Sequence, residues 1–142
     1  TSTTPPCTRD ICLYVDGFDA GLDAWDKTGA SPYLDADGWP SGEYNDYVST
    51  DTDNAETGDY SFENTAQTGY PLTVEISIRA KDVIVGDDKV EVWAWESVGG
   101  WEKVGEINPT GVMAWNLVEA STKFDTCAKI NEALVRLKYV QV

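Results

Sequence analysis

Alternation of apolar and polar residues is the dominant pattern in the second half of the chain. Between Thr73 and Arg79, valine and isoleucine occupy every second position and polar residues fill the positions between them. This period of two predicts a strand with one buried face. Residues 88–96 and 101–107 alternate in the same way, and the glycines at 99–100 lie between them, which predicts a β-hairpin.

The other segments also predict strands rather than helices. Residues 112–120 and 131–142 alternate, and an irregular or helical crossover is expected over residues 122–129. Weaker strand signals in the first half of the chain cover residues 11–18, 24–34, 44–49 and 60–68. About eight to ten short strands without a convincing helix predict an all-β, two-sheet antiparallel sandwich.

The length of the chain predicts one domain. A chain of 142 residues can bury a single good core, so we expect one sandwich domain over residues 11–142. Residues 1–10 are rich in threonine and proline and predict an extended segment, which is either a candidate donated strand or an ordinary frayed tail. We also expect the final strand, which runs to Val142, to be exposed as an edge on which another chain can pair.

Acidic residues are concentrated in the first 63 positions, which hold fourteen Asp and Glu against Arg9 and Lys27. The whole chain has a net charge of −15, which disfavours nucleic acid and anionic membranes as partners. Asp-rich loops at residues 35–38 and 51–59 combine carboxylates with turn-forming residues, as a hard cation such as Ca²⁺ requires. A solvated acidic face that maintains solubility is the alternative interpretation.

The chain contains no histidine and three cysteines, Cys7, Cys12 and Cys127. Without histidine, Ser–His and Cys–His nucleophile pairs and the usual zinc sites cannot form. Two carboxylates could still hydrolyse a glycoside, but no particular pair is indicated among 25 acidic residues, and we do not expect an enzyme. The cysteines predict either one disulfide that ties the two ends of the chain through Cys127, or three buried thiols in a reduced protein.

The sequence also favours export from the cell. No stretch approaches the roughly 18 to 20 apolar residues of a membrane span, and the chain opens directly on threonine, serine and proline. We interpret it as a mature secreted chain from which any export signal has been removed. The expected location is therefore extracellular.

Tryptophan is frequent, with six residues in the chain. In the strand predicted at residues 88–96, valine and alanine share one face, whereas Trp93 and Trp95 share the other. Trp101 follows just across the turn. If the aliphatic face is the core, these rings point outward, where they would stack on sugars or pack against a neighbouring subunit. Burial of both faces as ordinary core is the third interpretation.

Two parts of the sequence resemble secreted jelly-roll modules of the carbohydrate-binding and adhesion type. Residues 16–25 contain the order Phe-acid-x-Gly-Leu-x-x-Trp, which resembles the turn from the first strand of those modules into the second. The Gly-Gly-Trp turn and the closing residues 133–139 resemble their second half. The resemblance implies a jelly-roll fold with a structural calcium near the first turn, at Asp16 and Asp19.

Taken together, the acidic composition, the Asp-rich loops, the lack of histidine and the extended termini resemble the subunits of cannulae, the extracellular tubules of hyperthermophilic archaea. This resemblance implies a self-assembling homopolymer in which calcium lies at subunit contacts and strands are donated between neighbours. The candidate ligands, chosen by their chemistry, are Asp35, Asp37, Asp51, Asp53, Glu56 and Asp59. The segment from Asp51 lacks the glycine and the bidentate acid of an EF-hand, so another loop geometry is required. A non-catalytic carbohydrate-binding module or adhesin domain with a structural calcium is the alternative.

Overall fold

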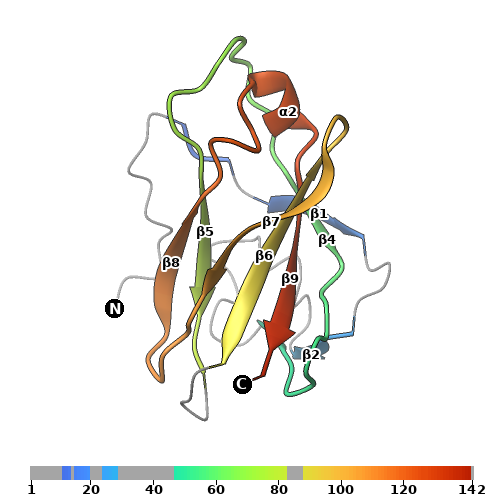
Figure 1. Cartoon of the computed structure of the whole chain (residues 1–142), viewed down its shortest axis with the longest axis vertical. Coiled ribbons are helices and arrows are strands. Elements are labelled where there is room, and N and C mark those ends of the chain that lie inside the picture. Colours follow the sequence, from blue (N-terminus) through green and yellow to red (C-terminus); the bar gives the residue numbers. More distant parts are fainter. Residues whose placement is uncertain (1–10, 14, 20–23, 29–46, 83–87, 142) are drawn as a thin grey trace.

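The described part of the chain is all-β, with antiparallel strands and one short helix. The computed structural model describes residues 11–13, 15–19, 24–28, 47–82 and 88–141. Its elements are β1 (Val15–Asp19), β2 (Asp26–Thr28), β3 (Tyr47–Ser49), β4 (Asp59–Phe62), β5 (Glu75–Ala80), β6 (Lys89–Glu96), β7 (Gly100–Ile107), β8 (Ala114–Glu119), α2 (Cys127–Asn131) and β9 (Leu134–Val140). Figure 1 shows α2 at the upper end of the molecule and the end of β9 at the lower end.

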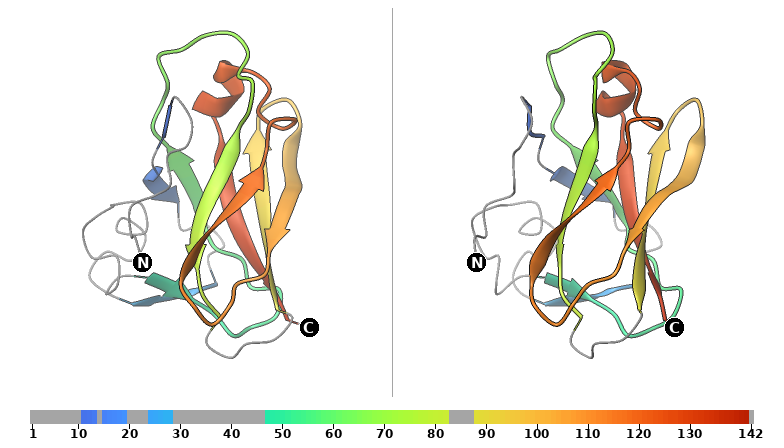
Figure 2. Two further views of the ribbon diagram at one scale, coloured as in Figure 1. Left: turned by 90° about the vertical axis from the view of Figure 1, so that its left-hand side faces the viewer. Right: turned by 60° about the vertical axis from the view of Figure 1, so that its left-hand side comes forward.

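The strands form one large sheet and two small ones. The large sheet has five strands in the order β1-β4-β9-β6-β7, while β5 pairs with β8 and β2 pairs with β3. Figure 2 shows β5 and β8 in front of the five-stranded sheet, so that two antiparallel layers face each other. This arrangement agrees with the predicted all-β, sandwich-like architecture.

The core lies between these layers and is built from the alternating strands. Val92 and Ala94 of β6 are 0% exposed, and Val118 of β8 is buried against them. Ile76 and Ile78 of β5 pack on the same cluster but remain partly exposed. The prediction that the aliphatic face of β6 forms the core is therefore confirmed.

The predicted hairpin is also confirmed, and a buried carboxylate holds its turn. Glu96, at the end of β6, accepts hydrogen bonds from the backbone N–H groups of Val98 (2.9 Å) and Gly99 (2.6 Å). Gly100 has a φ of +70°, which glycine adopts without steric cost. The amino group of Lys123 lies 3.3 Å from Glu96 Oε1 and donates to the carbonyl oxygen of Gly100. Lys123 therefore links the turn to the segment that precedes α2.

The prediction that the final strand is an exposed edge is wrong. β9 lies inside the five-stranded sheet, paired with β6 along its whole length and with β4 at Tyr60 and Ser61. The backbone of residues 54–57 adds further hydrogen bonds to Leu137 and Tyr139. Val135 is buried among the core residues, so this strand completes the core from the middle of the sheet. The position of a strand along the chain does not determine its position in a sheet.

The disulfide predicted to join the two ends of the chain through Cys127 is also wrong. Cys12 is disulfide-bonded, whereas Cys127 is a free thiol that is 8% exposed. Cys127 is the first residue of α2, and its N–H donates to the carbonyl oxygen of Gly69 (2.9 Å). The thiol is therefore buried by packing against the residue 69 loop. Cys7 lies outside the described residues.

Strand boundaries agree better in the second half of the chain than in the first. The crossover expected at residues 122–129 contains α2, which begins after the N-cap Thr126. In the first half, β4 covers only the beginning of the segment predicted at residues 60–68, and residues 29–34 and 44–46 of the predicted segments lie outside the described residues. The extended segment at residues 1–10 lies outside the described residues. In the part of the chain that is described, no helix has the length and apolar character needed to cross a membrane.

Candidate functional site

The most distinctive surface of the molecule is the side of the five-stranded sheet that points away from β5 and β8, which we call the outer face. Strand register and alternation with the core residues place its side chains. They are Lys89, Glu91, Trp93 and Trp95 of β6, Trp101, Lys103 and Glu106 of β7, Leu134, Arg136, Lys138 and Val140 of β9, Asp59 and Ser61 of β4, Asp19 of β1 and Asp16, which accepts a hydrogen bond from Ser61, and Glu56.

Three tryptophans occupy neighbouring positions on the outer face and form its aromatic group. Trp95 lies directly opposite Trp101 in the β6–β7 register, and Trp93 lies two residues before Trp95 on the same face. Directly opposed residues have Cβ atoms about 5 Å apart, so these rings are close neighbours. All three are partly exposed, in contrast to the buried valines on the other face of β6. The tryptophans thus lie where the sequence predicted them if the aliphatic face is the core.

Arg136 fixes one end of this aromatic group. Its guanidinium carbon lies 3.9 Å from the centroid of the Trp101 ring. The same guanidinium donates from Nε to Asp59 Oδ1 (2.9 Å), and its Nη2 lies 2.8 Å from that oxygen. A cation over an aromatic ring and a charge-assisted hydrogen bond both restrict the arginine. One face of the Trp101 ring is therefore already covered by the protein itself.

A ladder of alternating charges runs beside the tryptophans. Lys103 Nζ lies 3.2 Å from Glu91 and 3.1 Å from Glu106, and Lys89 lies 3.4 Å from Glu106. Hydrogen bonds to Glu106 and Glu91 raise the pKa of Lys103, and those from Lys103 and Lys89 lower the pKa of Glu106. Burial alone would raise the pKa of Glu91, but bonds from the Trp93 indole N–H (3.0 Å) and Lys103 outweigh it and lower that pKa. The ladder is therefore fully charged at neutral pH.

Acid is expected to weaken this ladder. Because the pKa values of Glu91 and Glu106 are lower in the folded chain, their contribution to stability is complete above about pH 4.5 and is lost as the pH falls through the lowered values. Urea unfolding midpoints measured from pH 7 to pH 3 should decrease in that lower range. A Lys103→Met variant should show a shallower decrease, and an equally steep one would contradict this origin.

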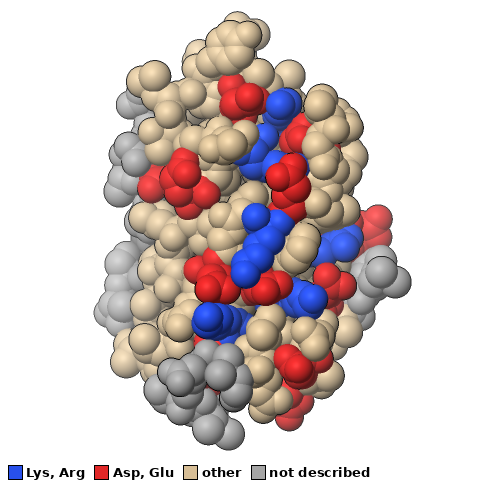
Figure 3. Space-filling model, viewed as in Figure 1, with Lys and Arg blue, Asp and Glu red and all other residues tan. Residues whose placement is uncertain are grey.

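Charge on the outer face is nearly balanced although the chain is strongly acidic. The described side chains of this face include four basic and six acidic groups, so they contribute two of the fifteen net negative charges of the chain. Figure 3 shows basic groups running from the upper to the lower part of the molecule, interspersed with acidic groups, in the region where Figure 1 draws β6, β7 and β9. Most of the negative charge of the chain therefore comes from residues other than the described ones of this face.

Three predicted calcium ligands lie near the first strand. Asp19 stands opposite Asp59 in the β1–β4 register, so the structure brings these two candidates together. Asp59 is bound by Arg136, however, and Asp16 accepts a 3.4 Å hydrogen bond from Ser61 Oγ. The candidate pair is thus already neutralised in part by a basic side chain.

The other described candidates, Asp51, Asp53 and Glu56, lie in the loop between β3 and β4. Asp53 accepts hydrogen bonds from Gln141 N–H (2.9 Å) and Asn54 Nδ2 (3.2 Å), and Asp51 is exposed. Among the residues that the structure describes, no three His, Cys, Asp or Glu side chains come together in a group that could hold a metal ion. Asp35 and Asp37 lie outside those residues.

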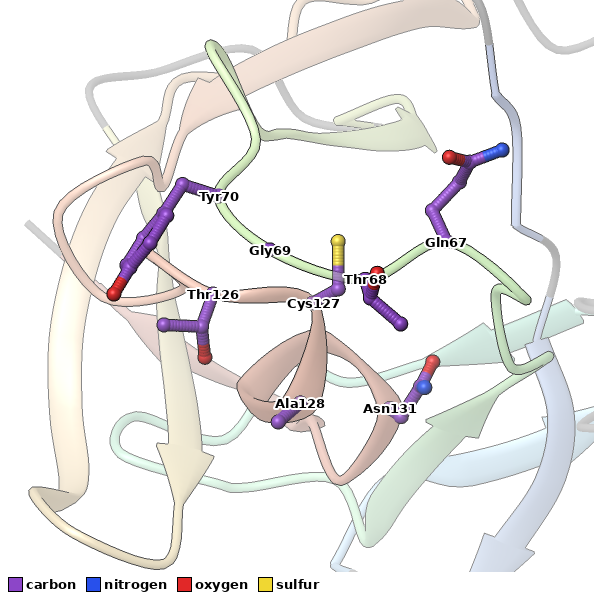
Figure 4. A pocket seen from close by; sticks show the side chains of 8 residues that line it. All are labelled: Gln67, Thr68, Gly69, Tyr70, Thr126, Cys127, Ala128 and Asn131. Carbon is purple, nitrogen blue, oxygen red and sulfur yellow. The ribbon is translucent and has the colours of Figure 1, made fainter.

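A cavity that the sequence did not predict lies beside α2. It has a volume of about 390 Å³. Figure 4 shows the residues that line it, which are Gln67, Thr68, Gly69, Tyr70, Thr126, Cys127, Ala128 and Asn131. None of them is charged. Asn131 anchors the facing loop through hydrogen bonds to the backbone N–H (2.8 Å) and carbonyl (3.2 Å) of Thr65. The two sides of the cavity are more than fifty residues apart in sequence, and no local pattern signals their meeting.

Comparisons with known proteins do not assign a function to these sites. No protein-family model matches the sequence, and neither the curated proteins nor the solved structures gave a significant match. What the chain does must therefore be inferred from its own residues.

Proposed function

We propose that the chain is a non-catalytic structural subunit that assembles with copies of itself into an extracellular filament or tubule. The observation that carries this proposal is the outer face, where Trp93, Trp95 and Trp101 remain partly exposed on a surface of balanced charge. Tryptophan and arginine are the residues that contribute most at the centres of protein interfaces. The covered ring of Trp101 favours a protein partner over a stacked sugar at that position.

Charge explains why assembly would need calcium. A chain with a net charge of −15 repels its own copies, because the acidic surfaces approach each other as an interface forms. Ca²⁺ takes six to eight oxygen ligands and could draw them from two chains at once. Asp51 and Asp53 are better candidates for this role than Asp59, whose carboxylate binds Arg136. A site completed only between subunits requires no closed ligand set within one chain.

The same proposal includes jelly-roll connectivity and strand donation. Ile76 and Ile78 of β5 are partly exposed, whereas Val92 and Ala94 of β6 are fully buried. Within the described residues, β5 pairs with β8 alone. An extended segment of a neighbour, such as residues 1–10, would cover these isoleucines by adding a strand beside β5.

Calcium is expected to switch assembly on. Light scattering of the purified chain should rise as CaCl₂ is added, negative-stain electron microscopy should show filaments or tubes, and excess EDTA should reverse both changes. The physical reason is that bridging ions replace repulsion between acidic surfaces with attraction. A chain that stays unassembled in millimolar calcium would rule out this function.

The residue 51–59 loop can be tested separately. The double variant Asp51→Asn with Asp53→Asn should raise the calcium concentration at the assembly midpoint several-fold, because it removes two carboxylates from the proposed contact. A control with the same change in charge is Glu119→Gln with Asp125→Asn, both exposed in the second half of the chain. If both double variants shift the midpoint equally, only total charge matters and the loop is not the site.

Carbohydrate binding is the second candidate function, favoured by the cavity beside α2. Its lining combines hydroxyl and amide side chains with Tyr70, which is 83% exposed, a combination suited to a neutral sugar. Oligosaccharides that bind the outer face should quench tryptophan fluorescence. Binding that leaves this fluorescence unchanged but is lost in Tyr70→Ala would instead place the sugar in the cavity. Calorimetry that detects no binding to any of a panel of oligosaccharides would exclude this candidate.

A further inference from the structure

The outer face has the features of a contact between two identical surfaces. Its aromatic group is not covered by any described element, because β5 and β8 lie on the opposite side of the sheet (Figure 2). Its charges are held in place by one another, from Lys89 through Glu106 and Lys103 to Glu91. A surface with few movable groups loses little conformational entropy when a partner binds.

We infer that a second copy of this chain packs on the outer face through its own outer face, forming a two-fold pair that does not need calcium. This inference rests on the proposed self-association and specifies its first step. The described side chains of the outer face contribute only two of the fifteen net negative charges of the chain. Two outer faces can therefore approach each other with much less repulsion than the total charge of the chain implies.

The size of the face suits such a pair. β6 and β7 have eight residues each and β9 has seven, which gives strands of roughly 25 Å at about 3.3 Å per residue. With neighbouring strands about 4.8 Å apart, the five-stranded sheet has a projected area of roughly 500 Å². Because side chains project from the sheet, the accessible area of the face is larger than this projected area. It therefore comes closer to the roughly 800 Å² that each partner buries in a stable interface.

Lys138 supplies a specific polar contact for the partner. It lies on β9, opposite Glu91 of β6 on one side and opposite Glu56 on the other. Its charge helps to lower the pKa of Glu91, but within the described part of the chain no carboxylate lies at ion-pair distance from Lys138, unlike Lys89, Lys103 and Arg136 on the same face. An acidic side chain of the second copy can therefore bind it. Calcium would then act in a later step, where pairs join through their acidic surfaces.

Sedimentation velocity in EDTA and about 0.1 M salt tests this inference on the intact chain. We expect a monomer–dimer equilibrium without calcium, and Trp95→Ser and Lys138→Glu should each weaken it at least tenfold. Circular dichroism checks that the variants are folded, and Lys138→Glu retains all apolar packing. The matched controls Val98→Ser and Val112→Ser change residues that are 81% and 66% exposed away from this face, and should leave the equilibrium unchanged.

Several outcomes would overturn the inference. A chain that is monomeric at all concentrations up to 1 mM in EDTA excludes the pair, and a dimer weakened by Val98→Ser or Val112→Ser but not by the outer-face variants uses another surface. Filaments that form in calcium from such a monomer would leave the proposed function intact while removing this step. A dimer that never forms filaments would support the pair and reject the proposed function.

Discussion

Replacing Lys123 by methionine is expected to lower the thermal unfolding midpoint by roughly 10 °C. The side chains of Lys123 and Glu96 are each 4% exposed, and Lys123 Nζ lies 2.8 Å from Glu102 as well as 3.3 Å from Glu96. Methionine keeps the length of the apolar stem but removes the charge, which leaves the Glu96 carboxylate buried without its counter-charge. Differential scanning calorimetry at pH 7 measures the change.

The pH dependence of this loss identifies its origin. Burial alone would raise the pKa of Glu96, but hydrogen bonds from Val98 and Gly99 and the charge of Lys123 outweigh it and lower the pKa. The stabilisation is therefore complete above about pH 4.5 and disappears as acid protonates the carboxylate. The deficit of Lys123→Met relative to the unmodified chain should shrink below about pH 4.

A surface lysine provides the control for this variant. Lys129 pairs with Asp125, whose side chain is 56% exposed, at a distance of 3.0 Å. Because exposed ion pairs contribute little, Lys129→Met should change the midpoint by only a degree or two. If Lys123→Met is no more damaging than Lys129→Met, the buried link does not hold the hairpin turn.

Replacing Gly105 by alanine is expected to destabilise the fold by about 1 to 3 kcal/mol. Gly105 lies on the inner side of β7, next to an irregularity in the β6–β7 register. A Cβ atom there would lie 2.6 Å from Cγ1 of Val118, which is 5% exposed in β8. The glycine thus allows the edge of the five-stranded sheet to approach the second layer closely. Urea unfolding of the purified variant measures the loss.

A second substitution tests whether the loss of stability comes from this clash. Val118→Ala removes the methyl groups that the new Cβ would meet, at the cost of its own core packing. In the Gly105→Ala background it should cost less than it does alone, since the two residues are coupled. Strict additivity of the two free energies of unfolding would show that the steric account is wrong.

The pattern of alternation predicted the strands of the second half because each strand has one face that packs on the core and one face that points away from it. The segment from Thr73 to Arg79 became β5, and its isoleucines pack on the core as expected. The same pattern could not place β9 between β4 and β6, since strand order depends on contacts between distant residues. Nor could the absence of a bridge to Cys127 be read from the number of cysteines.

The candidate site was predictable only in its local parts. Trp93 and Trp95 were assigned to one face because they are two residues apart on one strand. The contact of Arg136 with Asp59 and Trp101 joins residues far apart in sequence, and Asp59 was therefore assigned to calcium by its chemistry alone. Which basic side chain a carboxylate binds is decided by contacts that exist only in the folded sheet.

The central position of β9 also determines when the five-stranded sheet can be completed during synthesis. Residues 134–140 are translated after the other described strands, yet they join β4 to the β6–β7 hairpin. Until they leave the ribosome, the two halves of the sheet have no shared neighbour, and Arg136 cannot reach Trp101 or Asp59. A nascent chain without β9 therefore lacks the centre of the surface on which, in our proposal, a second copy packs.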